Sequence, residues 1–268
     1  MATPSNYRQL HYSRRHVWVA RLSRLLSFSY TQRHGLIKGM RRKGGLGFLP
    51  ERLAHKETAE TRFFQSLALS GKVVYDVGAF QGLMTLFFAR DARRVITYEP
   101  NPVSHARAAE NIRLNNLQNV TLRNVGVGAE AGELKLVYDP LMPGAASGDP
   151  QVGGQISDMA DQVRQATVRV VRLDDDIRGS DLPSPDFMKV DVEGMELGVL
   201  KGAQETLLRT HPAIYIELHG ADDLHKAANA RAVVEYLREC GYSNILNVET
   251  GAPVRDEIGK PLHIYAIS

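Results

Sequence analysis

Short apolar stretches alternate with amphipathic stretches from residue 72 onward. The apolar runs are rich in Val, Ile and Tyr and have the length of buried strands. Between them, apolar residues recur at the spacing of one helix face. The pattern predicts strands at 72–77, 94–98, 120–125, 187–192 and 213–218, and helices at 83–89, 103–115, 196–209 and 230–240. Strands that alternate with helices are typical of an α/β fold in which both faces of a parallel sheet are covered.

The C-terminal end adds two more strand candidates, at 244–248 and 263–267, with a turn at Gly251 between them. A turn between two consecutive strands favours antiparallel pairing. The whole pattern therefore predicts a doubly wound, mostly parallel, seven-stranded Rossmann-like sheet with an antiparallel edge.

An insertion follows the third strand. Residues 133–138 and 167–172 read as a strand pair, and they flank the segment 139–161, which is rich in Gly, Pro, Ser and Ala. That composition predicts a mobile loop, and long loops in compact domains are often substrate loops or lids.

Charge divides the chain near residue 50. Residues 1–50 contain no Asp or Glu and ten basic residues: Arg8, Arg14, Arg15, Arg21, Arg24, Arg33, Lys38, Arg41, Arg42 and Lys43. Residues 51–268 hold the other 23 basic residues and all 30 acidic residues, a net charge of −7. The net charge of +3 thus combines an acidic body, which we take as the catalytic domain at 51–268, with a basic arm at 1–50.

The arm is expected to be helical because its apolar residues fall at helical spacing: Trp18, Leu22, Leu25 and Leu26, with Ser29 after them. Three interpretations stay open: a helix packed on the domain, an organelle transit peptide, or an interfacial helix that contacts a membrane or another anionic partner through residues 14–43. The acidic body argues against a nucleic-acid substrate, although an arm of this charge suits a polyanion.

Other bulk properties exclude some classes. The single cysteine, Cys240, excludes an intramolecular disulfide and a cysteine metal cluster. No apolar run has the length of a membrane span or of a signal-peptide core. We therefore expect a cytoplasmic enzyme, with a peripheral membrane contact as the alternative.

The first predicted strand ends in a glycine turn, Asp76-Val77-Gly78-Ala79-Phe80-Gln81-Gly82. Glycine at the carboxyl end of a first strand allows a tight turn and a close approach of a ligand to the backbone. A dinucleotide-binding turn would read G-x-G-x-x-G, whereas here a carboxylate precedes the first glycine. That carboxylate would repel a pyrophosphate but suits the ammonium and sulfonium groups of S-adenosylmethionine. Asp76, Gly78, Ala79 and Gly82 are the predicted cofactor residues of the turn.

Further cofactor contacts are expected at the ends of the next two strands. Glu99 ends the second strand and can accept hydrogen bonds from both ribose hydroxyls. Asn101 follows it, and Asn124 and Val125 end the third strand, where they would meet the adenine.

The fourth strand runs into Lys189-Val190-Asp191-Val192-Glu193-Gly194-Met195-Glu196, and the fifth ends in Glu217-Leu218-His219. With these runs the sequence resembles the FkbM family of methyltransferases. The resemblance also covers Tyr98-Glu99-Pro100-Asn101, Leu173-Asp174-Asp175, Lys201-Gly202-Ala203 and Pro212-Ala213-Ile214-Tyr215-Ile216, within about residues 57 to 220. It implies a class I methyltransferase fold and methyl transfer, commonly to an oxygen of a sugar, polyketide or other natural product.

The acceptor half of the site is expected at the ends of the fourth and fifth strands. His219 is the candidate base for an acceptor hydroxyl because its ordinary pKa lies near neutrality. A structural imidazole is the alternative for this residue. Asp191 would hold the cofactor's amino group or orient the acceptor, and Lys189 would bind an acidic substrate group or be anchored by Glu217. Asp191, Glu193, Glu217 and His219 could instead hold Mg²⁺ or another divalent ion.

The main hypothesis is an O-methyltransferase that acts on a small molecule or glycan. A nucleic-acid or protein methyltransferase and a non-catalytic cofactor-binding module are the alternatives. An NAD-dependent oxidoreductase is disfavoured by the missing G-x-G-x-x-G pattern.

Overall fold

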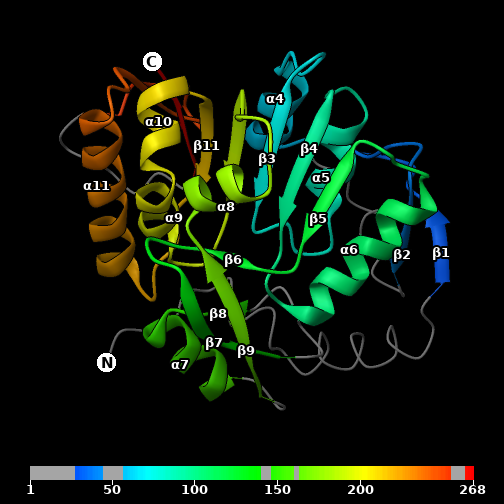
Figure 1. Ribbon diagram of the computed structural model, residues 1–268, viewed down its shortest axis with the longest axis horizontal. Coiled ribbons are helices and arrows are strands. Elements are labelled where there is room, and N and C mark those ends of the chain that lie inside the picture. The colour runs from blue at the N-terminus through cyan, green and yellow to red at the C-terminus, as the bar shows by residue number, and fades with distance from the viewer. Residues whose placement is uncertain (1–27, 45–56, 140–145, 160–162, 255–262) are drawn as a thin grey trace.

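The computed structural model describes residues 28–44, 57–139, 146–159, 163–254 and 263–268. The predicted seven-stranded sheet is present (Figure 1). In spatial order its strands are β12 (Asn244–Asn247), β13 (His263–Ile267), β11 (Ala213–Glu217), β10 (Phe187–Val190), β3 (Val73–Val77), β4 (Arg94–Tyr98) and β5 (Val120–Arg123). β13 runs antiparallel to both of its neighbours, β11 and β12, and the other pairs are parallel. The doubly wound sheet with an antiparallel edge is confirmed.

Helices cover both faces of this sheet. One face packs on α8 (Leu173–Gly179), α9 (Glu196–Gly202), α10 (Gln204–Thr210) and α11 (Asp223–Glu239), and the other on α4 (Ala59–Ser66), α5 (Leu83–Ala89) and α6 (Pro102–Leu114). Side chains of β3 alternate between the two cores: Val73, Tyr75 and Val77 face the first, and Val74 faces the second. This period of two follows from the pleat of the strand.

The helix predicted at 196–209 is interrupted, so that prediction is wrong at one point. α9 ends at Gly202 and α10 begins at Gln204. The buried carboxylate of Asp174 accepts hydrogen bonds from the backbone N–H groups of Glu205 and Thr206, at 2.9 and 3.0 Å. The start of a second helix is thereby satisfied by a side chain from α8. Helices α4 and α8 had no counterpart among the predicted elements.

The insertion after β5 forms a small sheet of its own, which lies below the main sheet in Figure 1. The predicted strand pair is confirmed as β7 (Gly132–Tyr138) and β9 (Arg164–Val171), joined by β6 (Gly126–Val127) and β8 (Ala146–Ser147). The mobile loop predicted at 139–161 is wrong for its described part, because residues 150–159 form helix α7 (Pro150–Met159). Asp149 starts this helix by accepting from the N–H groups of Gln151 and Val152.

The described part of the basic arm is a β-hairpin and not the predicted helix. β1 (Phe28–Thr31) pairs antiparallel with β2 (Arg41–Gly44) through a turn in which Gly35 and Gly39 have positive φ angles. Such angles favour glycine and end any helical pattern there. The apolar stripe from Trp18 to Leu26 lies outside the described residues, as does the domain boundary at residue 50.

The hairpin is anchored to α6. Asn115 and Asn111 accept from the backbone N–H groups of Arg41 and Lys43, and Lys43 pairs with Glu110 at 2.7 Å. The anionic partner predicted for residues 14–43 stays a prediction. None of the helices in the described ranges has both the length and the apolar character that a bilayer crossing requires.

Gly202→Ala is expected to destabilise the fold. An added Cβ would lie 2.1 Å from the backbone oxygen of Gly128, so one segment must shift. We expect a loss of about 1–3 kcal/mol in the free energy of unfolding, which chemical denaturation would measure. Gly179→Ala is the matched control, since its Cβ would meet nothing within 4 Å. Equal stability of the two variants would contradict this packing argument.

Candidate functional site

The site lies where the strand order reverses, at the carboxyl ends of β3 and β10. Ligands of open α/β sheets bind at such switch points. Asp191, just after β10, donates its N–H to the backbone oxygen of Val77 at 3.0 Å. Gly78 has a φ of +83°, and a Cβ there would lie 1.7 Å from the backbone oxygen of Asp191. Glycine at 78 is therefore required for the two strand ends to meet.

Asp76 is fully buried beside this contact. Its Oδ2 accepts from the hydroxyl of Thr85 at 2.6 Å, and its Oδ1 is buried without a hydrogen-bond partner in the described part of the chain. Burial raises the pKa of Asp76, and the charge of Lys189 opposes this effect. An unpartnered buried carboxylate oxygen fits a cationic ligand group, as the sequence predicts for S-adenosylmethionine.

Glu99 follows β4 and joins two loops. Its Oε2 accepts from the N–H of Phe80 at 2.6 Å and its Oε1 from the N–H of Asn101 at 2.8 Å. Burial raises the pKa of Glu99 to about 8, against the effect of these two backbone donors. A carboxylate offers about four lone-pair positions, so roughly two remain for ribose hydroxyls. Phe80 has a φ of +51°, a strained conformation for a side chain of this size.

The other predicted cofactor residues surround this point but have structural partners. Asn101 caps α6, and Asn124 donates to the backbone oxygens of Glu99 and Pro100. Val125 packs on the core. Gly82 has a φ of +76° and starts α5, where an added Cβ would press on Ala108. Ala79 donates its N–H to the backbone oxygen of Tyr98 at 3.1 Å, so the turn is held against β4.

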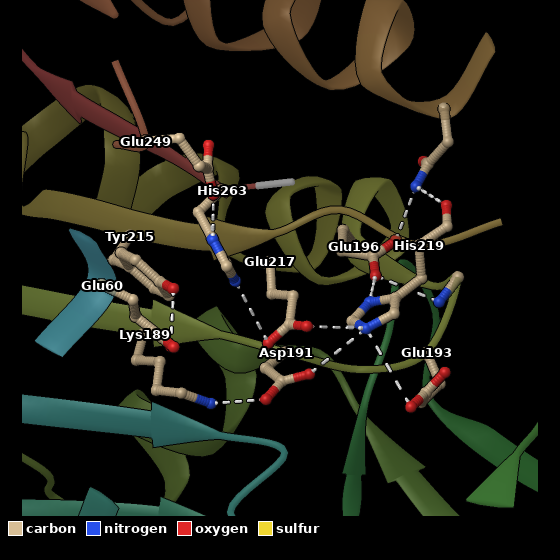
Figure 2. A network of polar contacts seen from close by, with 12 residues as sticks. Glu60, Lys189, Asp191, Glu193, Glu196, Tyr215, Glu217, His219, Glu249 and His263 are labelled. Atoms are coloured by element: carbon tan, nitrogen blue, oxygen red, sulfur yellow. Dashed lines mark hydrogen bonds and ion pairs between the residues drawn. The ribbon is translucent and has the colours of Figure 1, made fainter. Parts of the chain in front are cut away.

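His219 lies beyond β11 at the centre of a carboxylate cluster (Figure 2). Its Nδ1 contacts Oε1 of Glu196 at 2.8 Å, and Glu196 has no exposed surface. Its Nε2 faces Glu217 Oε1 at 3.4 Å, Asp191 Oδ1 at 3.8 Å and Glu193 Oε1 at 4.0 Å. Glu196 therefore orients the ring, and Nε2 is the atom that faces the cluster.

The protonated form of His219 is strongly favoured. Burial alone would lower the pKa of this imidazole. Its interactions with Glu196 and Glu217, and the charges of Glu193 and Asp191, outweigh burial and raise the pKa well above the ordinary value. Glu196 is itself held by the N–H of Gly194 at 3.0 Å and by the side chain of Asn229 at 2.7 Å.

Lys189 is also buried, with 4% of its surface exposed. Its Nζ donates to Asp191 Oδ2 at 2.8 Å, so Lys189 holds Asp191 in place. The predicted anchor, Glu217, is a weaker influence: burial lowers the pKa of Lys189, and Asp191 and Asp76 raise it more than Glu217 does. The net result is a pKa above the ordinary value, so the ammonium stays charged.

Further polar residues lie next to Glu217. His263 on β13 is paired across the sheet with Glu217, and its Nε2 is 3.7 Å from Glu217 Oε2. Its Nδ1 contacts Glu249. Tyr215 donates its hydroxyl to Glu60 of α4 at 2.9 Å. Glu60, His263 and Glu249 were missed because nothing local in the sequence places β13 or α4 against β11.

The insertion also reaches the site. The hydroxyl of Ser147, at the end of β8, donates to the backbone oxygen of Glu193 at 2.9 Å. Glu193 has a φ of +50° and Gly194 a φ of +97°, so the loop after β10 turns sharply at the same place. The predicted substrate segment thus touches the acidic loop through its described part.

Comparison with known proteins agrees with this geometry. The model of the FkbM methyltransferase domain matches residues 76–243, from the glycine turn to the loop before β12. The chain belongs to the FkbM methyltransferase family. The match contains residues of both groups described above, since Asp76 is its first residue and His219 lies within it.

Two curated relatives and one solved structure extend the comparison. The chain is 31% identical over 160 residues to the methyltransferase sdnD of Sordaria araneosa, a match of 51% of this chain and 62% of the relative. It is 30% identical over 151 residues to the hexuronic acid methyltransferase AglP of Haloferax volcanii, 56% of this chain and 57% of the relative. The chain thus spans less than two thirds of either relative.

The solved structure is a methyltransferase FkbM from Methylobacillus flagellatus, with 20% identity and a TM-score of 0.51 over 79% of this chain and 48% of that one. At this identity the likeness concerns the fold. It supports the class I methyltransferase arrangement that the sheet order displays.

Glu196→Gln is expected to lower the pKa of His219 toward its ordinary value, because the variant removes the charge on Nδ1's partner. Because the pKa of His219 is raised in the folded state, protonation of its imidazole stabilises the fold. This stabilisation is complete below the unfolded-state pKa of about 6.5 and is lost as the pH rises through the folded-state pKa. The variant should therefore lose more stability at pH 6 than at pH 9, by about 1–3 kcal/mol. NMR titration of His219 and denaturation at both pH values would measure this.

Glu205→Gln is the control for that variant. Glu205 is an exposed partner of Arg178, so its replacement should leave the titration of His219 unchanged. The free energy of unfolding should change by no more than about 0.5 kcal/mol. An unchanged titration of His219 in Glu196→Gln would show that Glu196 does not set its protonation.

Proposed function

We propose that this protein is an S-adenosylmethionine-dependent methyltransferase that methylates a hydroxyl oxygen of a small-molecule or glycan acceptor. The observation that carries the proposal is the juxtaposition at the switch point. Oδ1 of Asp76 is buried with no hydrogen-bond partner among the described residues, and His219 has its imidazole oriented by Glu196. Asp76 lies on β3 and His219 follows β11, the two neighbours of β10, which ends just before Asp191. Membership of the FkbM family supports methyl transfer as the reaction.

The cofactor is assigned to the turn and strand ends on the β3–β4–β5 side. Asp76, Gly78, Ala79 and Gly82 would line its methionine portion, together with Asp191. Glu99, Asn101, Asn124 and Val125 would line its ribose and adenine. The cofactor supplies an electrophilic methyl group on a sulfonium. The negative charges of Asp76 and Asp191 suit the positive charges of that molecule.

The acceptor is assigned to the β10–β11 side. Transfer to a hydroxyl requires the loss of its proton, and Nε2 of His219 is the atom that faces the cluster. Because Glu196 holds Nδ1, the ring cannot turn away. His219 is proposed as the base, Asp191 as the group that orients the acceptor, and Lys189 as the residue that positions Asp191. The name of the Haloferax relative supports a sugar among the candidate acceptors.

The domain organisation is part of the proposal. Residues 51–268 would form the methyltransferase unit and residues 1–50 a basic arm. Within the described ranges the arm is linked to the cofactor turn, since Asn111 accepts from the N–H of Lys43 and donates to the backbone oxygen of Gln81 at 2.8 Å. The cytoplasmic location expected from the composition stays a prediction.

Glu99→Ala is expected to weaken S-adenosylmethionine binding at least tenfold, because it removes the ribose acceptor and releases the N–H groups of Phe80 and Asn101. Isothermal calorimetry on the full chain would measure the dissociation constant. Glu110→Ala is the control, since this side chain lies on α6 and pairs with Lys43. No binding by the wild-type chain, or equal binding by both variants, would overturn the cofactor assignment.

Methyl transfer by metal-free protein should rise with pH from 6 into the alkaline range. His219 must be neutral to accept a proton, and its pKa is raised above 6.5. His219→Asn should lower kcat by about 10²–10⁴-fold. His225→Asn, at an exposed position of α11, should leave kcat unchanged. The rate is followed by the formation of S-adenosylhomocysteine from a panel of sugar, hexuronate and polyketide alcohols. Full turnover of His219→Asn across pH 6 to 9 would exclude it as the base.

A further inference from the structure

Three side-chain atoms from two strand ends converge at the acceptor half of the site. Asp191 Oδ1, Glu217 Oε1 and His219 Nε2 all lie within 4.8 Å of one another, and Nε2 is 3.8 and 3.4 Å from the two oxygens. We propose that these three atoms bind one divalent metal ion. Only the role of the ion in catalysis rests on the proposed function, since binding itself depends on the three side chains alone.

Each of the three side chains is held from outside the cluster. Asp191 is held at Oδ2 by Lys189, His219 at Nδ1 by Glu196, and Glu217 at Oε2 by His263. Every ligand therefore presents its remaining atom to the same point, as the dashed lines of Figure 2 show. Histidine ligands of metal ions commonly have their second nitrogen bound to a carboxylate in this way, which fixes the tautomer and the ring orientation.

The network around the three atoms contains more carboxylates than basic groups. Of the ten labelled residues of Figure 2, six carry carboxylates (Glu60, Asp191, Glu193, Glu196, Glu217 and Glu249) and three are basic (Lys189, His219 and His263). Even with both histidines protonated, the set has a net charge of −3, and Lys226, whose ammonium interacts with Glu217, Glu249 and Glu196, reduces it to −2. Glu196 has no exposed surface, and the side chains of Asp191 and Glu217 are 28% and 26% exposed. Partly buried negative charge of this density is stabilised by a bound cation.

The spacing suits an ion of ordinary size. Neighbouring ligands of a six-coordinate ion with bonds of about 2.1 Å lie about 3 Å apart, and opposite ligands about 4.2 Å apart. The distances from His219 Nε2 to the oxygens of Asp191 and Glu217, 3.8 and 3.4 Å, fall between these two values. One imidazole and two carboxylates favour Mn²⁺ or a similar first-row ion over Ca²⁺.

A second group of potential ligands, Glu60, Glu217 and His263, is a weaker candidate. Glu60 already accepts from the hydroxyl of Tyr215, and His263 is engaged by Glu249. These residues support the first group by holding Glu217.

The proposed ion defines the class of acceptor. Three protein ligands leave three positions of a six-coordinate ion for other oxygens. An acceptor with two adjacent oxygens, such as a vicinal diol or a hydroxyl next to a carboxylate, would occupy two of them. With the ion bound, His219 would be a ligand. The ion would stabilise the acceptor oxygen as an alkoxide, and the carboxylate of Glu193, 4.0 Å from Nε2 of His219, would take its proton. His219 acts as the base only in the metal-free protein.

Titration of the EDTA-treated full chain with Mn²⁺ tests the site without cofactor or acceptor. The electron paramagnetic resonance signal of free Mn²⁺ should be reduced by an amount that corresponds to one bound ion per chain. Affinity should rise with pH, because the ion displaces the proton of His219. Asp191→Asn and Glu217→Gln should each weaken binding at least tenfold. Asp222→Asn is the matched control, since it removes the carboxylate of an exposed Asp–His pair with His225 and should leave binding unchanged.

A second readout identifies the ligand independently of affinity. In electron paramagnetic resonance, the unpaired electrons of bound Mn²⁺ should show magnetic coupling to one imidazole nitrogen. This coupling should be lost in His219→Gln, and circular dichroism would confirm that the variant is folded. Absence of binding at 1 mM Mn²⁺, or equal binding by wild type, Asp191→Asn and Glu217→Gln, would overturn the proposal. Calorimetry with S-adenosylmethionine, run in parallel, tests the proposed function separately. Metal binding without cofactor binding would contradict that function alone, and cofactor binding without metal binding would contradict the metal site alone.

Discussion

The contact between Gly78 and the backbone of Asp191 is the constraint on which the site depends. A Cβ at position 78 would lie 1.7 Å from the Asp191 oxygen, and Asp191 also donates its N–H to Val77. The residues assigned to the cofactor and those assigned to the acceptor are therefore joined by backbone at the point where the strand order reverses. A side chain at 78 would separate Asp76 from Asp191, and with them the two groups of residues that we assign to cofactor and acceptor. Stability and function share this requirement.

Side chains alternate between the two faces of the sheet along each strand, and this alternation places several polar residues on the same face. Val77, Val190 and Ile216 face one core, so the residues beside them in sequence, Asp76, Lys189 and Glu217, fall on the other side of the sheet. Lys189 donates to Asp191 at 2.8 Å, and its positive charge opposes the rise that burial causes in the pKa of Asp76. This lysine pairs with one carboxylate near His219, that of Asp191, while Glu193, Glu196 and Glu217 also lie within 4.0 Å of the imidazole nitrogens. That imbalance is the reason why protonation of His219, or a metal ion, matters to the site.

The sequence was sufficient to predict the features that are encoded locally. The apolar runs predicted the strands of the main sheet. The glycine turn and the acidic runs at strand ends identified the candidate site residues Asp76, Glu99, Asp191, Glu217 and His219. Features that depend on distant contacts were missed or wrong. The break between α9 and α10 depends on Asp174, and the hairpin at 28–44 depends on glycine turns and on Asn111 of α6. His263 reaches Glu217 only because β13 enters the sheet between β11 and β12, a pairing that periodicity does not specify.

Within the class of acceptor that the proposed ion would select, we infer that the insertion distinguishes one acceptor from another. Under the proposed function, the acidic cluster and the cofactor turn supply chemistry that any hydroxyl acceptor needs. The insertion instead contributes Ser147 to the backbone of Glu193, and its Val152 and Asp149 lie against Gly194. A change in the packing of α7 would therefore move Glu193 and Gly194, and the N–H of Gly194 would pass that movement to Glu196, which orients His219. Asp191 is held separately, by the sheet and by Lys189. The insertion can then affect both the recognition of the acceptor and the orientation of the proposed base, because one loop joins Ser147 to Glu196.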